Sequence, residues 1–229
     1  MKTSKMVLGV VGVLGTVAGS SLAHEGDVGF TILGQRITVG IVEDTGSGEV
    51  VVPGQRVFGG EIGLTIPGFG DEPGFFGEAG TLDLGSQLGF NVMGALRKWD
   101  EVNQTFVVAS EALRLERPDG VVDVTTPATD VFTPGWAFTF PGAGDFDDHP
   151  NFFVENRTGA GIYSIELRFF TDQNGIADSD SFWLVINDGL DEAVHEAAIE
   201  YVEDVVVPAP GAIGVGLAGL LMAARRRRA

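Results

Sequence analysis

The sequence predicts a mainly β protein, a β-sandwich or jelly-roll-like domain with one amphipathic helix near its C-terminal end. Short apolar segments with period-2 alternation recur along the chain, separated by Gly, Pro, Asp and Ser turn residues. This pattern is typical of strands with one solvated face. Many short strands with frequent turn signals favour a sandwich or a jelly roll. A helical period appears only after about residue 190.

The strands are predicted from local alternation and from β-branched runs. The clearest alternation places Tyr163, Ile165, Leu167 and Phe169 on one face. Further short strands are predicted at residues 28–33, 37–42, 50–52, 113–115 and 136–140. The Gly- and Pro-rich stretch 59–80 is predicted to be a long loop.

The last strand and the helix are predicted to pack together. Residues 182–186 are apolar on both faces, which indicates a central strand covered on each side. A helix is expected over about residues 190–204, capped by Asn187 or Asp188, with an apolar stripe that covers the second face of this strand. Its other face is acidic. The helix is therefore expected to act as a terminal clasp.

The first 23 residues have the organisation of an export signal. Lys2 and Lys5 precede the apolar stretch 6–18, and Ser21-Leu22-Ala23 offers small residues at the positions that a signal peptidase reads. Cleavage after Ala23 would make His24 the mature N-terminus. The sequence thus predicts a signal peptide at 1–23, a β domain at 24–204, and the export machinery and signal peptidase as partners.

The last 25 residues, 205–229, have the organisation of a membrane sorting tail. A proline-rich break precedes the uncharged segment 211–224, and four arginines follow. This segment is shorter than the ~20 residues that span a bilayer comfortably, so a short transmembrane helix is expected. Positive charge beside an apolar segment resists translocation. The body is therefore expected outside the cell membrane.

This tail resembles the PEP-CTERM sorting signal of Gram-negative and planctomycete-type bacteria. Pro208 and Pro210 stand at its two proline positions, Ala209 replaces its glutamate, and the basic end consists of Arg225, Arg226, Arg227 and Arg228. The resemblance implies sorting by an exosortase-like enzyme in the membrane. An ordinary tail anchor is the alternative. The stretch from His149 to Trp183 also resembles bacterial surface-anchored β domains, which implies a location at the cell envelope or surface, followed by release in some cases.

Composition limits the partners. The 229-residue chain has 14 Lys+Arg and 32 Asp+Glu, and six of the basic residues lie in the two predicted signals. The exported body then carries 8 basic against 32 acidic residues, a net charge of −24. Such a body repels nucleic acid and anionic lipid. With no cysteine, disulfides, thiolate metal sites and cysteine nucleophiles are excluded.

No complete catalytic motif is present in the sequence. His195-Glu196 begins like a zinc-protease helix, but Ile199 stands where the second histidine is needed. His195 is therefore expected on the helix surface. Neither a Gly-x-Ser-x-Gly elbow nor a phosphate-binding Gly-x-x-x-x-Gly-Lys loop occurs. A non-enzymatic protein is predicted.

Two candidate metal sites follow from ligand chemistry. Asp172, Asn174, Asp178 and Asp180 have the spacing of the front of a Ca²⁺ loop, although Trp183 takes the place of its final glutamate. The alternative is an ordinary turn. An exposed His24 amine and imidazole, together with His149, would resemble the copper brace of polysaccharide monooxygenases and periplasmic copper carriers. That hypothesis predicts a copper-binding protein or a copper-dependent oxidase.

Aromatic residues raise a last alternative. Trp99, Trp136 and Trp183 could stack on sugars in an extracellular polysaccharide, but each lies within or beside an apolar strand pattern, so core packing is expected. The leading hypothesis is an exported, non-enzymatic protein of the cell surface or extracellular matrix. A calcium-dependent or glycan-binding module and a copper-binding protein are the alternatives.

Overall fold

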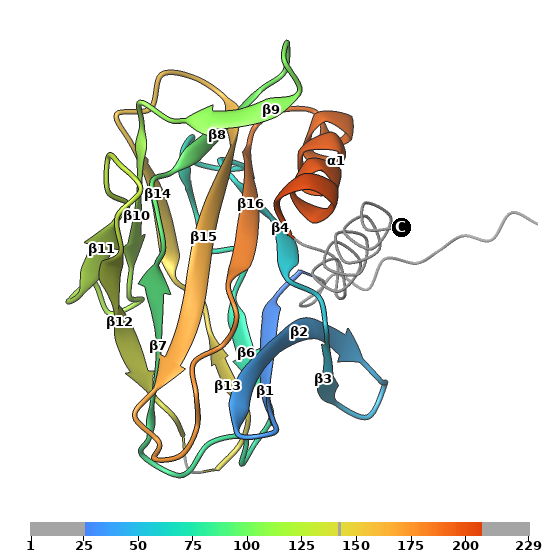
Figure 1. Cartoon of the computed structure of the whole chain (residues 1–229), viewed down its shortest axis with the longest axis vertical. Helices are drawn as coiled ribbons and strands as arrows, with labels where there is room; N and C mark the ends of the chain where they lie inside the picture. The colour runs from blue at the N-terminus through green and yellow to red at the C-terminus, as the bar shows by residue number, and fades with distance from the viewer. Residues whose placement is uncertain (1–25, 142, 208–229) are drawn as a thin grey trace, which may run out of the picture.

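The body is mainly β, as predicted, and one short α-helix follows the strands (Figure 1). The computed structural model describes residues 26–141 and 143–207. His24, the predicted signal peptide and the tail from Pro208 lie outside these residues. Within the described residues, no helix is long and apolar enough to cross a membrane. The predicted transmembrane segment 211–224 lies outside them as well.

The strands form three sheets. The first sheet, in spatial order, contains β13 (Phe146–Asp148), β6 (Phe75–Gly77), β1 (Val28–Leu33), β2 (Arg36–Asp44) and β3 (Glu49–Pro53). The second contains β11 (Asp123–Thr125), β10 (Ala112–Glu116), β14 (Asn151–Glu155) and β5 (Phe69–Gly70). The third contains β12 (Thr133–Thr139), β7 (Gln87–Val92), β15 (Gly161–Thr171), β16 (Phe182–Asp188) and β4 (Val57–Ile62), with β8 (Arg97–Asp100) and β9 (Thr105–Val108) as a hairpin beside β15.

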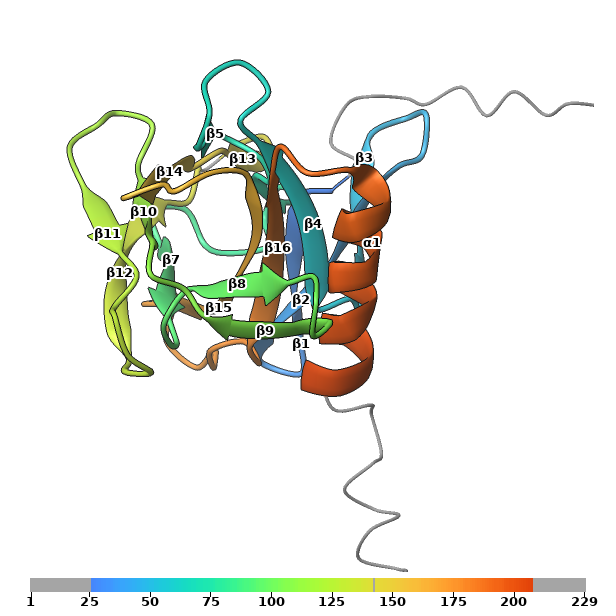
Figure 2. The same cartoon turned by 90° about the horizontal axis from the view of Figure 1, so that it is seen from above.

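The main core collects aromatic side chains from all three sheets, whose strands are seen from above in Figure 2. Phe75 of the first sheet contacts Phe169 of the third edge to face, with ring centroids 5.1 Å apart. Phe152 contributes from the second sheet and is fully buried. Edge-to-face pairs of this kind add to the free energy gained by burying the rings. The core therefore holds the sheets together without a disulfide.

Strand β16 is the central covered strand that the sequence predicts. All of its residues are buried. Leu184 and Ile186 enter the main core, whereas Trp183 and Val185 enter a second apolar cluster with Ala198 of the helix. Opposite faces of a strand alternate with period 2, so the helix covers the second face, as predicted.

The helix begins later than predicted and has a different N-cap. Helix α1 spans Glu192–Tyr201 and continues as a π-helical turn, η1 (Val202–Val206). The capping position is Asp191, so the prediction of Asn187 or Asp188 was wrong. The Asn187 side chain instead bonds the backbone N and O of Leu190, both at 2.9 Å, and thereby closes the turn that leads into the helix.

The sequence predicted one long loop over the Gly-rich stretch 59–80, and this prediction was wrong. It contains the end of β4, all of β5 and all of β6. Its glycines mark close packing: a Cβ on Gly77 would lie 2.3 Å from the Phe30 ring, and one on Gly70 would lie 2.6 Å from Ile62. Only glycine permits such an approach. The glycine content of a segment does not distinguish closely packed strands from a loop.

Candidate metal centre

His149 follows strand β13 and lies in a ring of acidic side chains. Its Nδ1 is 3.1 Å from the carbonyl oxygen of Asp71. Because a carbonyl only accepts, Nδ1 donates, and Nε2 is the nitrogen that can act as a ligand in the neutral ring. Nε2 faces Asp147 Oδ1 at 3.3 Å and Asp27 Oδ2 at 3.8 Å. This orientation suits an imidazole ligand held by a backbone carbonyl.

Asp27 and Gly74 fix the position of the His149 imidazole ring. Asp27 is 1% exposed, and its Oδ1 accepts a 2.7 Å hydrogen bond from the backbone N of Gly74. A Cβ on Gly74 would lie 2.6 Å from His149 Cε1, so a larger residue would push the ring away. Ligand atoms of Asp27, Asp147 and His149 all lie within 4.8 Å of one another.

The charges of this centre favour a bound proton or cation. Burial lowers the pKa of His149, but the carboxylates of Asp27 and Glu72 outweigh it and raise the pKa above its ordinary value. Burial raises the pKa of the Glu72 carboxyl, and Asp27 adds to this effect while His149 opposes it. Neighbouring negative charge raises the pKa of both groups, whereas burial raises only that of Glu72.

Of the two predicted copper ligands, the structure describes only His149. His24 lies outside the described residues, three positions before Asp27 in the sequence. Asp27 and Glu72 were missed because they lie more than 70 residues before His149 in the sequence, and nothing local links them to it. The sequence did carry a weak signal for this place, since Asp145, Asp147 and Asp148 cluster just before His149.

The predicted calcium residues lie between β15 and β16 and make other contacts. Asp172 Oδ1 accepts a 2.7 Å hydrogen bond from the backbone N of Gln87, and Asp180 pairs with Arg36 at 2.7 Å. Asn174 is an exposed turn residue beside Gly175, whose φ is +85°. Asp178 is also exposed. The calcium role of Asp172, Asn174, Asp178 and Asp180 stays a prediction.

The three tryptophans are core residues, as expected. Trp99 and Trp136 are 6% exposed and Trp183 is 9% exposed. Trp183 also lines a cleft of about 400 Å³ with Phe106, Tyr201, Arg97 and Glu166, among others. This cleft joins aromatic and charged side chains beside the end of the helix.

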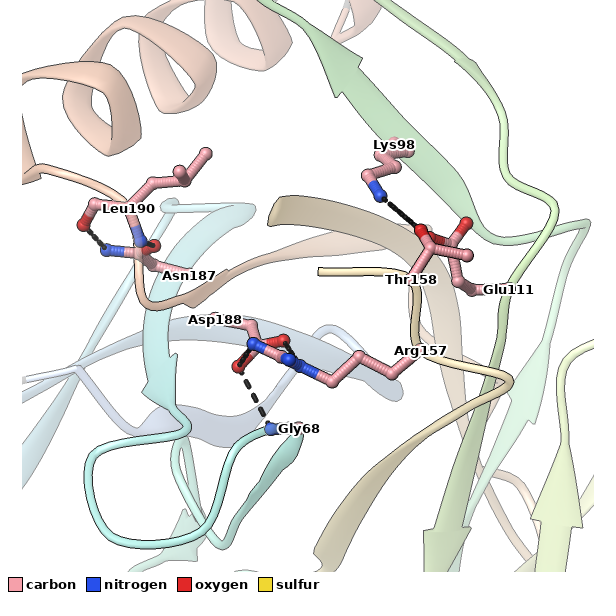
Figure 3. Close-up of polar contacts among 8 residues, drawn as sticks. All are labelled: Gly68, Lys98, Glu111, Arg157, Thr158, Asn187, Asp188 and Leu190. Carbon is pink, nitrogen blue, oxygen red and sulfur yellow. Dashed lines mark hydrogen bonds and ion pairs between the residues drawn. The ribbon is translucent and has the colours of Figure 1, made fainter. Parts of the chain in front are cut away.

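Two ion pairs, each with a buried carboxylate and a partly exposed cation, stabilise the fold near the ends of β15 and β16 (Figure 3). Arg157 Nε is 2.5 Å from Asp188 Oδ2, and Asp188 Oδ1 accepts a hydrogen bond from the backbone N of Gly68 at 3.0 Å. Lys98 Nζ is 2.7 Å from Glu111 Oε1. Because hydrogen bonds satisfy these charges, we interpret them as structural.

His195 is buried, so the prediction that it lies on the helix surface was wrong. It is 3% exposed, and its Nε2 is 2.8 Å from the carbonyl oxygen of Val185. The acidic composition of the helix concealed that this residue points to the sheet.

Comparison with known proteins found no matching family model and no matching curated sequence.

Proposed function

We propose that this chain is an exported, non-enzymatic protein of the bacterial cell surface or extracellular matrix. The observation that carries the proposal is the order of the tail: Pro208-Ala209-Pro210, the apolar segment 211–224 and four arginines. The signal-peptide pattern at 1–23 supports the same route. Sorting by an exosortase-like enzyme, with an envelope anchor before processing, follows from the resemblance to PEP-CTERM signals.

The body fits this proposal in composition and in packing. Its buried apolar residues, among those described, run from Val28 to Val202, between the two proposed signals. Phe30 and Phe169 come from two different sheets and meet with centroids 5.7 Å apart. Such packing supports a sandwich or jelly-roll-like arrangement of the sheets. The net charge of −24 at 24–204 suits a dispersed extracellular domain and disfavours nucleic acid.

Intact-mass spectrometry of the exported protein from its native host tests the proposal. The expected mass corresponds to a chain that starts at His24, because Ser21-Leu22-Ala23 is the predicted cleavage signal. Removal of the region after Pro210 is expected if the sorting enzyme cuts the tail. The variant Ala209→Glu, which restores the family's glutamate, should increase the cut fraction.

Two results would contradict this route. Retention of Met1 in the envelope or medium fraction would exclude the signal peptide. A tail variant with Arg225–Arg228 changed to Gln should keep the start at His24 but lose its sorting. If that variant is sorted normally, the tail is not the sorting signal.

A cation-binding role is the second candidate, because the His149 centre supports it. His149 Nε2 lies beside two carboxylates, one of them buried, so an imidazole and two acidic side chains meet at one place. A free His24 amine would add the donors of a copper brace or of a copper-dependent oxidase. The same mass spectrum decides this point, since a mature start other than His24 contradicts the brace. Calcium at Asp172, Asn174, Asp178 and Asp180 and binding of an extracellular polysaccharide stay predictions, and the burial of the three tryptophans does not support their stacking on sugars.

A further inference from the structure

We propose that Glu61, Glu192 and His195 form a divalent-cation site between edge strand β4 and helix α1, separate from the His149 centre. One ligand atom from each of these three side chains lies within 4.8 Å of the other two. The donor set is one imidazole nitrogen and two carboxylate oxygens. This set suits a first-row transition ion such as Zn²⁺, whereas Ca²⁺ and Mg²⁺ prefer oxygen ligands only.

The imidazole carries the argument. Nε2 of His195 is 2.8 Å from the carbonyl oxygen of Val185, so Nε2 holds the hydrogen and Nδ1 of the neutral ring holds the electron pair. Nδ1 is buried and has no hydrogen-bond partner among the described residues. Buried polar atoms nearly always have a partner. A metal ion bound to Nδ1 would be the partner that this buried nitrogen lacks among the described residues.

The two carboxylates of the cluster make no hydrogen bond to Nδ1. Glu192 Oε2 is 3.7 Å away, which is too far for a hydrogen bond. An ionised carboxylate also accepts only, so Nδ1 and the Glu192 carboxylate present electron pairs to each other, and a Glu61 oxygen belongs to the same cluster of ligand atoms. A cation removes this repulsion. The backbone carbonyl of Val185 then acts as the outer partner that metal-bound histidines usually have.

The backbone places these side chains on facing surfaces. Glu192 and His195 are three residues apart, and side chains at this spacing share a helix face. On β4, Val57 belongs to the apolar cluster under the helix, so Gly59 and Glu61 share its face by period-2 alternation. A Cβ on Gly59 would lie 3.3 Å from His195 Cε1 and 3.0 Å from Ile199 Cδ1. Glycine at this position lets the helix approach the strand.

An ion has a route to this site. Glu61 and Glu192 are exposed, while His195 forms the buried end. Three protein ligands leave one coordination position open to water, as in many zinc sites with a free position. The bound ion would tie the helix to the strand at the edge of the third sheet (Figure 2).

Zn²⁺ titration of the purified full chain, stripped of metal with a chelator, tests the site. The variants Glu61→Gln and Glu192→Gln keep the side-chain size but remove one charged ligand each. Each should weaken one class of Zn²⁺ sites at least tenfold by calorimetry. Glu196→Gln removes the same charge from an exposed neighbour on the same helix, and it should leave the affinity unchanged.

Two further measurements separate the site from its alternatives. Asp147→Asn weakens only the His149 centre, so Zn²⁺ binding that is lost in this variant alone overturns the proposal. The ¹⁵N resonance of His195 Nδ1 should shift when Zn²⁺ binds. An unshifted resonance, or a hydrogen on Nδ1 that persists at saturating Zn²⁺, shows a protonated ring in place of a metal ligand. Equal affinity in all variants and the unaltered chain overturns the site as well.

Discussion

Glu111 is a buried carboxylate that its neighbours keep ionised. It accepts hydrogen bonds from Lys98 at 2.7 Å, Thr158 at 2.6 Å and Ser110 at 3.0 Å (Figure 3 shows the first two residues). Burial alone would raise the pKa of Glu111, but these hydrogen bonds outweigh it and lower the pKa to about 2. The folded state therefore stabilises the ionised form of Glu111 more than the unfolded state does.

The variant Glu111→Gln should reduce the free energy of unfolding by on the order of 3 kcal/mol at neutral pH, since each unit of pKa difference contributes about 1.4 kcal/mol. A lowered pKa stabilises the fold at pH values above the unfolded pKa. The difference between the two proteins should thus be complete above about pH 4.5 and shrink as the pH falls toward 2. Urea unfolding at pH 3, 5 and 7 measures it.

The control is Glu101→Gln, which removes a carboxylate from an exposed turn. It should change the free energy of unfolding by less than about 0.5 kcal/mol. An equal loss in both variants would mean that overall charge, and not the Lys98 pair, explains the effect.

The sequence predicted the burial of some single residues correctly and of others wrongly. The burial of Trp99, Trp136 and Trp183 followed from their apolar surroundings and is confirmed. His195 was missed because a helix pattern gives the spacing of a face but not which polar residue within that face finds a buried partner. Its partner is a backbone carbonyl of β16, which no side-chain pattern reveals.

At the scale of elements, the sequence specifies burial better than pairing. The double-faced apolar run 182–186 predicted a covered strand and a helix on one side, and both are present. The sequence did not reveal that β16 pairs in parallel with β4, from Trp183↔Val57 to Asp188↔Ile62. Periodicity describes one strand at a time, whereas this partner lies more than 120 residues earlier.

Gly135 sits where β12 and β7 change register, between Pro134 and Ala137. A Cβ there would lie 2.0 Å from the carbonyl oxygen of Phe90. We expect Gly135→Ala to lower the free energy of unfolding by about 1–3 kcal/mol, because the clash is with backbone and the strands must separate to relieve it. Thermal unfolding followed by circular dichroism measures the change.

Gly159→Ala is the matched control for this substitution. A Cβ on Gly159 meets no other atom within 4 Å, so this variant should keep its stability or gain slightly. A Gly135→Ala protein as stable as this control would show that the register shift tolerates a side chain.

At the scale of the whole molecule, the body carries far more negative than positive charge. The excess of 24 acidic residues over 24–204 opposes compaction by self-repulsion. Raising NaCl from about 20 mM to 500 mM should therefore raise the melting temperature by ~2–4 °C, the change that on the order of 1 kcal/mol gives for a chain of this size. A falling melting temperature would mean that attractive ion pairs, such as Arg157 with Asp188, dominate the response to salt.

The candidate metal centre shows what sequence reasoning leaves out at this scale. His149 was a predicted ligand, and the structure surrounds it with carboxylates. Its partners come from residues 27, 72 and 147, which three separate segments bring together. Ligand identity is a property of the residue, whereas ligand geometry is a property of the fold.

The docking of the helix has a mechanical consequence. A protein tethered through its C-terminal end takes up tension first at residues 202–207. There Val202 is 1% exposed, and Tyr201 Oη is 2.9 Å from Thr105 Oγ1 of the β8–β9 hairpin. Pulling on this end would load these contacts before any hydrogen bond of β16. Helix α1 would then detach first under the applied force, while the strands of the sheets beneath it stay paired.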